Sequence, residues 1–448
     1  MTASFNAGRA LLFGAVLVAA PLGAQTPITL PDDNAKPMTL TEAIGEAQRN
    51  APGVVNARGL ERNAGAARRS AIGAYIPSLN LTGSSARTQG VQFFQGQLVP
   101  LTGNPWNYNN GLATNLVLFD GGQRWQDLNR ARATTDVAEA TYTQARFDAA
   151  LQVKQQFYAA LAARESEAAA KAQLDQAEQQ LKASTARVAA GVATKSDSLR
   201  SAIQVGNARL AVLTSQNDLR VANAALTRVV GSTSTVTASP SDTVDAPFTM
   251  PTEAELETLI SRGPAVMVAE ANVAAAKASK KSQRSQYLPT LSMSYNYSYT
   301  QSSKAFAGGN LFLIGGNDPN RQNMSFNFSY PLFNQFVREQ ATVQADVALR
   351  NAEAQLRDAR LAARANLTTQ LRALANSQAR VQVQLAAIAA AEEDLRVQQQ
   401  RYALGASTLL DLLTSQTTLN QARQALIQAR FDGRIARAQL SSLIGKEM

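Results

Sequence analysis

The sequence predicts a mainly α-helical protein that also forms a membrane β-barrel, built from a duplicated unit of helix, strand, strand and long helical hairpin. Three observations predict this fold class. Short motifs recur in the two halves of the chain, as Pro52 and Pro264 illustrate. Aromatic and small polar residues alternate in two segments of the second half, which indicates strands. The stretches 123–190 and 334–404 lack glycine and proline, which favours long helices.

The N-terminal segment, 1–24, has the pattern of a secretory signal peptide. Arg9 supplies the positive charge and residues 11–20 form an apolar run, which is too short to span a bilayer as a helix. We expect cleavage after Ala24, although Leu22 is a large residue for a position so close to the cut. No later apolar run approaches the length of a membrane span and the chain has no cysteine for a lipid anchor. An exported chain of this kind enters a membrane only as a barrel.

The composition excludes several classes of function. The 448 residues include no cysteine and no histidine. Their absence rules out thiol nucleophiles, disulfides, Cys/His zinc sites and imidazole bases. No motif supports catalysis by aspartate, glutamate, lysine or tyrosine. We therefore expect a protein that is not an enzyme and that holds no cofactor and no catalytic metal.

The net charge of +10 invites comparison with nucleic-acid-binding proteins. Such proteins concentrate basic residues on one face, with aromatic residues for stacking. Here the basic residues are spread along the chain and interleaved with acids, as in 357–360, so we expect no nucleic-acid partner. The densest basic cluster suits a solvated helix face, with a role near acidic headgroups as the alternative. It consists of Lys277, Lys280, Lys281 and Arg284.

The two halves of the chain have the pattern of an internal duplication. The motif YIPSL at 75–79 matches YLPTL at 287–291, and Gly191 matches Gly405. The spacing between matched positions is slightly larger from Leu118 onward than at the YIPSL motif, so a loop of variable length lies between them. The predicted segments are a signal peptide over 1–24, a first repeat over 38–231, a linker over 232–250 and a second repeat over 251–446.

Each repeat is expected to begin with a short amphipathic helix, at about 41–71 and 251–286. Pro77 and Pro289 then mark a break. Two strands follow, separated by a loop rich in glycine, asparagine and serine. In the first repeat these strands are expected at 79–85 and 112–119.

The strands are clearest in the second repeat, at 291–299 and 324–330. Aromatic residues occupy one face and small polar residues the other, which is the pattern of a membrane-barrel strand. A soluble β-sandwich gives the same alternation, so this pattern alone does not decide between them. The residues expected to face lipid are Tyr295, Tyr297, Phe326 and Phe328.

A long helix is expected after each second strand. The stretch 123–190 could extend about 100 Å as a helix, and 334–404 is of similar length. The helices are expected to turn at Gly191 and Gly405 and to return over a shorter leg. Two antiparallel helical hairpins result.

The predicted strands cannot form a closed barrel within one chain. Two repeats supply four strands, and open sheet edges are not tolerated in lipid. Eight strands leave an interior just filled by side chains, whereas twelve leave a water-filled lumen. If the barrel prediction holds, closure therefore favours a trimer.

In this order of elements, and in the motifs RVAAGVATKSD (187–197) and RYALGASTLLD (401–411), the chain resembles the TolC-type outer membrane efflux proteins over residues 38–446. The resemblance implies a homotrimer with a twelve-stranded barrel in the outer membrane and a helical tunnel in the periplasm. It implies the exit duct of a tripartite efflux or type I secretion system, a passive conduit that is gated at its periplasmic tip. The implied partners are a periplasmic adaptor (membrane fusion) protein, an inner-membrane pump and outer-membrane lipid.

The resemblance also implies roles for residues at the tip. Asp411 falls where the family places an acidic ring at the pore constriction, and Tyr402 and Asp197 fall where a hydrogen bond between neighbouring hairpins helps to hold the tip shut. Two residues depart from the pattern: Ser407 replaces a basic residue, and Thr414 replaces a second aspartate. A solvated helix position for Asp411 and ordinary hairpin packing for Tyr402 are the alternatives. The residues implied in adaptor docking are Arg187, Gly191, Arg401 and Gly405.

A periplasmic or surface coiled-coil scaffold or adhesin without a pore is the main alternative. It would explain the helices and the signal peptide but not the aromatic alternation or the duplicated hairpins. The cargo is left open, because the sequence contains no histidine or methionine cluster that would indicate metal export.

Overall fold

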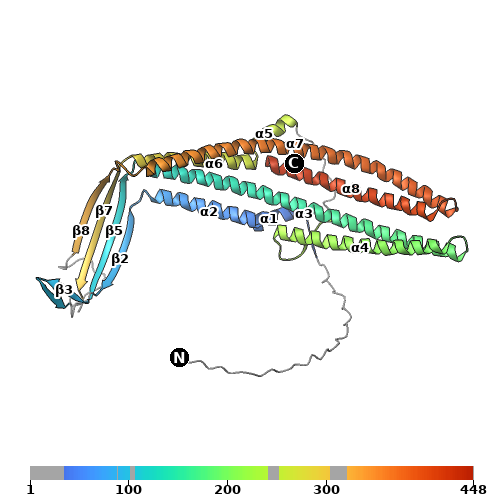
Figure 1. The fold of residues 1–448 in the computed structure, drawn as a ribbon, viewed down its shortest axis with the longest axis horizontal. Coiled ribbons are helices and arrows are strands. Elements are labelled where there is room, and N and C mark those ends of the chain that lie inside the picture. The colour runs from blue at the N-terminus through green and yellow to red at the C-terminus, as the bar shows by residue number, and fades with distance from the viewer. Residues whose placement is uncertain (1–34, 88, 101–105, 241–251, 303–319, 447–448) are drawn as a thin grey trace, which may run out of the picture. The chain divides into compact units, whose positions relative to one another are not determined.

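The computed structural model describes residues 35–87, 89–100, 106–240, 252–302 and 320–446. The predicted signal peptide and its cleavage site lie outside these residues. Figure 1 shows long helices running alongside one another and a small group of strands. No helix in the described ranges is both long and apolar enough to cross a bilayer.

Two helical hairpins account for most of the described residues, close to the predicted ranges. The long leg has 67 residues and the return leg 36 residues in both hairpins. In the first hairpin, Leu174 and Leu181 pack against Ala177 and Val205 across the two legs. The legs are α3 (Gln123–Ala189), α4 (Lys195–Val230), α7 (Val337–Ala403) and α8 (Leu409–Ile444).

Each predicted first helix is in fact two helices, so the expectation of one continuous helix over 41–71 and over 251–286 is wrong. Proline occupies the first position of the second helix in both cases, at Pro52 and Pro264. Proline lacks an N–H and forces an extended backbone on the residue before it, here Ala51 (ψ 130°). The helices are α1 (Leu40–Asn50), α2 (Pro52–Gly73), α5 (Glu253–Ile260) and α6 (Pro264–Arg284), the last followed by a 3₁₀ turn, Ser285–Tyr287.

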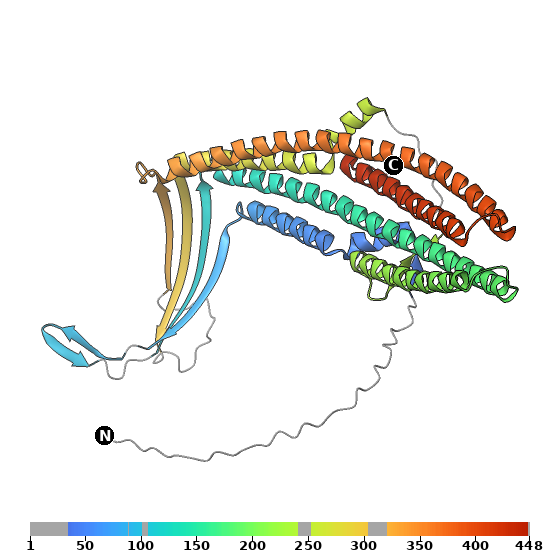
Figure 2. The ribbon, with the colours of Figure 1, turned by 45° about the vertical axis from the view of Figure 1, so that its right-hand side comes forward.

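Helices of the two halves pack against one another. α6 contacts both α3 and α7, and α2 contacts α3 (Figure 2). The Ser282 hydroxyl on α6 donates to Asp127 on α3, and Lys280 forms an ion pair with Asp346 on α7. α8 also contacts α3, where the Ser166 hydroxyl donates to Gln424 Oε1 over 3.1 Å.

Four strands form one antiparallel sheet in the order β2-β5-β7-β8 (Figure 1). β5, in the predicted first repeat, pairs with β7, in the predicted second repeat. β2 and β8 are the edge strands, and neither pairs with a further strand of the described chain. The strands are β2 (Ser78–Ala86), β5 (Asn107–Phe119), β7 (Thr290–Ser302) and β8 (Asn320–Ser329).

The register gathers apolar side chains on one face of this sheet. Met293 pairs with Phe326, and Leu81 pairs with Leu112. Directly paired residues of antiparallel strands lie on the same face. The apolar face comprises Leu79, Leu81, Leu112, Leu116, Leu291, Met293, Tyr295, Tyr297, Met324, Phe326 and Phe328. The opposite face comprises Asn80, Thr82, Asn109, Asn115, Ser292, Ser294, Asn296, Ser298, Ser325 and Asn327.

The sequence analysis missed two pairs of short strands. β3 (Val91–Phe94) and β4 (Gln97–Pro100) form a hairpin inside the segment expected to be a loop of the first repeat. Its turn places Gln95 and Gly96 at positive φ. β1 (Lys36–Met38) pairs in parallel with β6 (Val236–Ala238), which lies inside the segment expected to be a linker. Strands of three residues are too short for a period-two pattern to indicate them.

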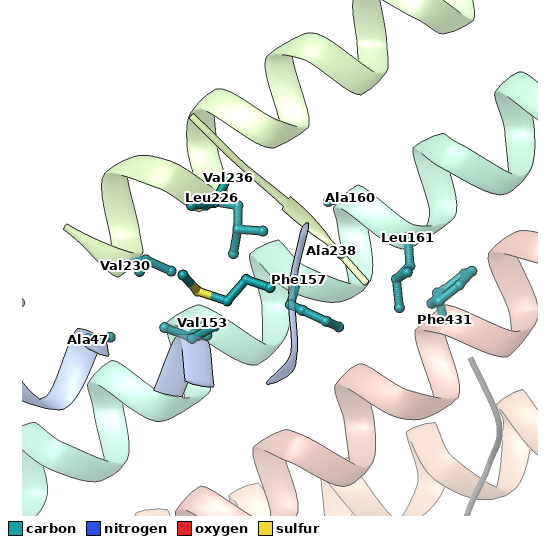
Figure 3. Packing of buried hydrophobic residues seen from close by; sticks show 12 residues of the cluster. Ala47, Val153, Phe157, Ala160, Leu161, Leu226, Val230, Val236, Ala238 and Phe431 are labelled. Atoms are coloured by element: carbon teal, nitrogen blue, oxygen red, sulfur yellow. The ribbon is translucent and has the colours of Figure 1, made fainter. Parts of the chain in front are cut away.

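A hydrophobic cluster explains why β1 and β6 form. Phe157 of α3 and Leu226 of α4 are fully buried there, together with Val236 of β6 (Figure 3). Ala47 of α1 and Phe431 of α8 complete the contacts. The short parallel pair therefore covers apolar side chains that four helices bring together, and burial of those side chains stabilises it.

Candidate functional site

The turn of each helical hairpin has the same backbone geometry. In the first hairpin Val192 N donates to Arg187 O over 3.0 Å, and in the second Ala406 N donates to Arg401 O over 2.8 Å. Gly191 and Gly405 both have a φ of +74°. This is the Schellman end of a helix, in which glycine provides the left-handed residue. The two predicted turn positions are therefore confirmed as turns.

A capping box starts the return leg of both hairpins. Asp197 Oδ2 accepts from Thr194 N over 3.1 Å, while Asp197 N donates to the Thr194 hydroxyl over 3.3 Å. Thr408 and Asp411 make the same reciprocal pair. The sequence analysis missed this role. The spacing of a threonine three residues before an aspartate, at the start of an apolar run, would have indicated it.

The capping box fixes the environment of Asp411. Its carboxylate accepts from Thr408 N (3.0 Å), from the Thr408 hydroxyl (2.7 Å) and from the Ser407 hydroxyl (3.5 Å). The hydrogen bonds from Thr408 hold the pKa of the Asp411 carboxyl below its usual value. The side chain remains exposed. Asp411 thus stabilises the start of its own helix and still presents a carboxylate to solvent.

Arg187 joins the two hairpin tips within one chain. Its guanidinium lies over the ring of Tyr402, 4.9 Å from the ring centre, and Nη1 donates to Ala403 O over 3.1 Å. Because Arg187 lies on α3 and Tyr402 on α7, this pair holds the first hairpin against the second. We call it the Arg187–Tyr402 clamp. The sequence analysis assigned Arg187 to docking and did not predict this contact.

The described chain does not contain the expected hydrogen bond between Tyr402 and Asp197. The Tyr402 hydroxyl is buried and has no hydrogen-bond partner among the described residues. Burial raises the pKa of this hydroxyl, the Arg187 guanidinium lowers it, and the Asp197 carboxylate adds to the increase. Asp197 is thus close enough to act on Tyr402 electrostatically. A bond between hairpins of neighbouring copies stays a prediction.

The remaining tip residues make local contacts. Arg401 Nη2 donates to Ala406 O over 3.3 Å, within its own turn. The Ser407 hydroxyl donates to Gln398 Oε1 over 3.0 Å, and the Thr414 hydroxyl donates to Leu410 O over 2.9 Å. Neither Ser407 nor Thr414 supplies the charge that the family pattern has at its position.

The predicted lipid-facing residues gather on one surface. Phe326 and Phe328 are 60% and 70% exposed, and Tyr295 and Tyr297 are half-buried on the same face of the sheet. No group of three or more histidine, cysteine or acidic side chains comes together in the described ranges as a metal site would require.

Comparison with known proteins gives a consistent result. The family model described as "Outer membrane efflux protein" matches residues 43–232 and 256–446. The cobalt-zinc-cadmium resistance protein CzcC of Cupriavidus metallidurans is 28% identical over 314 residues, which is 69% of this chain and 70% of that protein.

Two solved structures are similar in fold. The outer membrane protein VceC of Vibrio cholerae superposes with a TM-score of 0.72 at 18% identity, over 91% of this chain and 96% of that chain. The CmeC outer membrane channel of Campylobacter jejuni gives a TM-score of 0.75 at 14% identity, over 91% of this chain and 85% of that chain. At these identities the likeness concerns the fold alone.

Proposed function

The chain belongs to the outer membrane efflux protein family and is an efflux channel of the outer membrane, and we propose that three copies close one twelve-stranded barrel that continues into a helical tunnel. The apolar face of the sheet, together with its two open edges, carries the proposal. The comparisons give no support to a pore-free scaffold.

The sheet contains what closure needs. β2 and β8 lie at opposite edges and run antiparallel to each other, because the order β2-β5-β7-β8 alternates in direction. β8 of one copy can therefore pair with β2 of the next in the same antiparallel manner. Closed pairing satisfies every edge group, which a lipid environment requires. The apolar face then meets lipid and the serine and asparagine face lines the water-filled interior.

The helices contain a matching surface for a second copy. On α4, Leu199, Ile203, Leu210, Leu213 and Val221 form an exposed stripe, each more than half exposed. Their spacing places all five on one side of the helix. The opposite side of α4 packs on α3. The stripe therefore has no covering partner among the described residues.

The proposed duplication indicates what covers this stripe. Within one chain α8 packs on α3, and Gln424 contacts Ser166. When Gly405 is matched to Gly191, α4 is the counterpart of α8 in the other repeat, and α7 is the counterpart of α3. The contact between α8 and α3 therefore predicts an equivalent contact between α4 and α7. Gln424 then becomes Leu210, and Ser166 becomes Arg380. We infer that α4 of one copy packs on α7 of the next, with Leu210 beside Arg380 of the neighbouring copy.

Cross-linking tests this arrangement directly, because the natural chain contains no cysteine. The pair Leu210→Cys/Arg380→Cys, treated with a short bis-maleimide, should join chains into covalent dimers and trimers. The pair Ser166→Cys/Gln424→Cys is the matched control and should cross-link within one chain, migrating as a monomer. A Leu210/Arg380 pair that stays monomeric while the control reacts would refute the proposed interface.

The proposed gate lies at the hairpin tips, where an adaptor and an inner-membrane pump would act on Arg187, Gly191, Arg401 and Gly405. Three copies would place three Asp411 carboxylates around the axis. Rings of acidic side chains favour cations. Asp411→Asn should therefore lower cation selectivity and weaken block by a trivalent cation in planar-bilayer recordings. Unchanged selectivity and block would remove Asp411 from the constriction. The relative CzcC is named for cobalt, zinc and cadmium resistance, and we leave the cargo of this chain open.

A further inference from the structure

α2 and α6 become purely basic where they approach the sheet. The sequence contains no aspartate or glutamate over 62–119 or over 271–317. The helical parts of these stretches nevertheless carry several cations. They are Arg62, Arg68 and Arg69 on α2, and Lys277, Lys280, Lys281 and Arg284 on α6.

All of these cations except Lys280 are exposed and without a partner in the described chain. Lys280 is half-buried and forms its ion pair with Asp346. The others make no hydrogen bond or ion pair with a described residue. We call these six residues the basic collar: Arg62, Arg68, Arg69, Lys277, Lys281 and Arg284.

The α6 part of the basic collar is exposed along one side of the helix. Lys277, Lys281 and Arg284 follow the spacing i, i+4, i+7 and so form one stripe. Lys280 lies on the same side of α6 as this stripe and forms its ion pair with Asp346 of α7, whereas Ser282, which donates to Asp127 of α3, lies on another side. Like charges at this spacing repel one another. The negative end of the helix dipole offsets the repulsion in the last turn but does not reach Arg62 or Arg68 on α2.

With the sheet in the membrane as proposed, the α6 part of the basic collar lies close to the membrane surface. α6 ends at Arg284, and β7 starts at Thr290. At the rise of a helix, Lys281 is therefore about 10–15 Å below the first strand residue. Lysine and arginine side chains can extend from this depth toward the headgroups. Exposed aromatic residues at the adjoining helix starts, Trp125 and Phe336, mark the interface itself.

We propose that the basic collar binds the anionic headgroups of phospholipids in the leaflet next to the helices. The proposal rests on the proposed function, which places the sheet in the outer membrane. Unpaired cations next to a membrane surface attract acidic lipids with about 1 kcal/mol each. The absence of carboxylates over 62–73 of α2 and 271–284 of α6 removes the competing partners on the same stretch of helix. An anionic phospholipid such as phosphatidylglycerol supplies the missing negative charge.

The test compares spin-labelled phosphatidylglycerol with spin-labelled phosphatidylcholine in vesicles that contain the full-length protein. Electron paramagnetic resonance measures the motionally restricted fraction of each lipid. We expect a preference for phosphatidylglycerol of about fivefold, which corresponds to one such contact. The preference should approach unity in 1 M NaCl, where screening acts within about 3 Å. Lys277→Gln/Lys281→Gln/Arg284→Gln should lower the preference to about twofold, because the three arginines of α2 remain. Glutamine is chosen because it preserves helix propensity.

The matched control is Arg200→Gln/Arg220→Gln/Arg228→Gln, which neutralises three exposed arginines of α4 and should leave the preference intact. A wild-type preference of unity, or one that is unchanged in the α6 variant, would overturn the proposal. The proposal would also be overturned if the α6 variant changed the ion selectivity of the channel and left the lipid preference unchanged. In that case Lys277, Lys281 and Arg284 would face the tunnel. Channel recordings from the same vesicles separate the two proposals: channels without lipid preference refute the basic collar alone, whereas absence of channels in every lipid refutes the proposed function.

Discussion

Arg187 and Tyr402 connect the tips of the two hairpins within one chain. The guanidinium stacks on the ring of Tyr402 and donates to the next carbonyl, so one residue makes two contacts between hairpins. The basic residue that the family pattern has at position 407 is a serine here. The Arg187–Tyr402 clamp supplies a connection between the two hairpins that does not use position 407.

Removal of the clamp should favour an open tip. A cation–π contact contributes about 0.5–2 kcal/mol, so Arg187→Ala should raise the open fraction about 2- to 30-fold in planar-bilayer recordings. Arg401→Ala is the control, because Arg401 bonds only within its own turn. Equal effects of the two variants would show that the clamp does not hold the hairpins together.

Tyr402→Phe distinguishes a tip held closed by the Arg187–Tyr402 clamp from one held closed by a hydrogen bond of the Tyr402 hydroxyl. The Arg187–Tyr402 clamp needs only the ring, and the buried hydroxyl has no partner in the described chain. We therefore expect Tyr402→Phe to leave the open fraction unchanged or to lower it, because an unsatisfied buried hydroxyl is lost. A marked increase in open fraction would instead support a hydrogen bond from Tyr402 to Asp197 of a neighbouring copy.

The stability of the second hairpin tip should depend on pH through the ionisation of the Asp411 carboxyl. Thr408 holds the pKa of this carboxyl below its usual value, so the capping box contributes its full stability above about pH 3.9, the unfolded pKa. That contribution is lost as the pH falls through the lower folded-state pKa. Hydrogen exchange of the first turn of α8 should accelerate over this range, and Asp411→Asn should remove the dependence. An onset above pH 4 would indicate repulsion within a ring of three carboxylates, which raises a pKa.

At the scale of elements, the alternation of side chains along each strand divides the sheet into an apolar face and a polar face. Neighbouring residues of β8 point to opposite faces, so Phe328 and Asn327 differ in surroundings although they are adjacent in sequence. Phe328→Arg should destabilise the inserted protein by about 2–4 kcal/mol if this face meets hydrocarbon near the membrane centre, and by less near an interface. Urea titration of protein in vesicles measures the difference. Asn327→Arg should lower the free energy of unfolding far less than Phe328→Arg does. Equal losses in the two variants would mean that the apolar face does not meet lipid.

At the scale of the whole molecule, the open edges β2 and β8 support the proposed trimer. Each copy supplies four strands, and twelve strands leave a water-filled lumen. Protein extracted in mild detergent should have a mass near three mature chains by light scattering after correction for bound detergent. A stable monomer or dimer that still conducts ions would contradict closure by three copies.

Much of this architecture could be predicted from local patterns. Long runs without glycine or proline indicated the helices, because helix propensity accumulates over many residues. Strict alternation indicated β7 and β8, and Gly405 indicated a turn because a left-handed residue favours glycine. The break between the two helices before Pro52 could also have been predicted, because proline disfavours a helical conformation in the residue before it.

Only the tertiary structure decided features that depend on distant partners. β1 and β6 form because four helices leave an apolar cluster to cover, and nothing in their three-residue segments indicates this. Arg187 meets Tyr402 because two hairpins pack side by side, although the two residues belong to different halves of the chain. The sequence by itself determined the long helices, their turns and the strands β7 and β8, since propensity and periodicity act within a few turns. Which side chains meet across them depends on packing between elements, which no local pattern records.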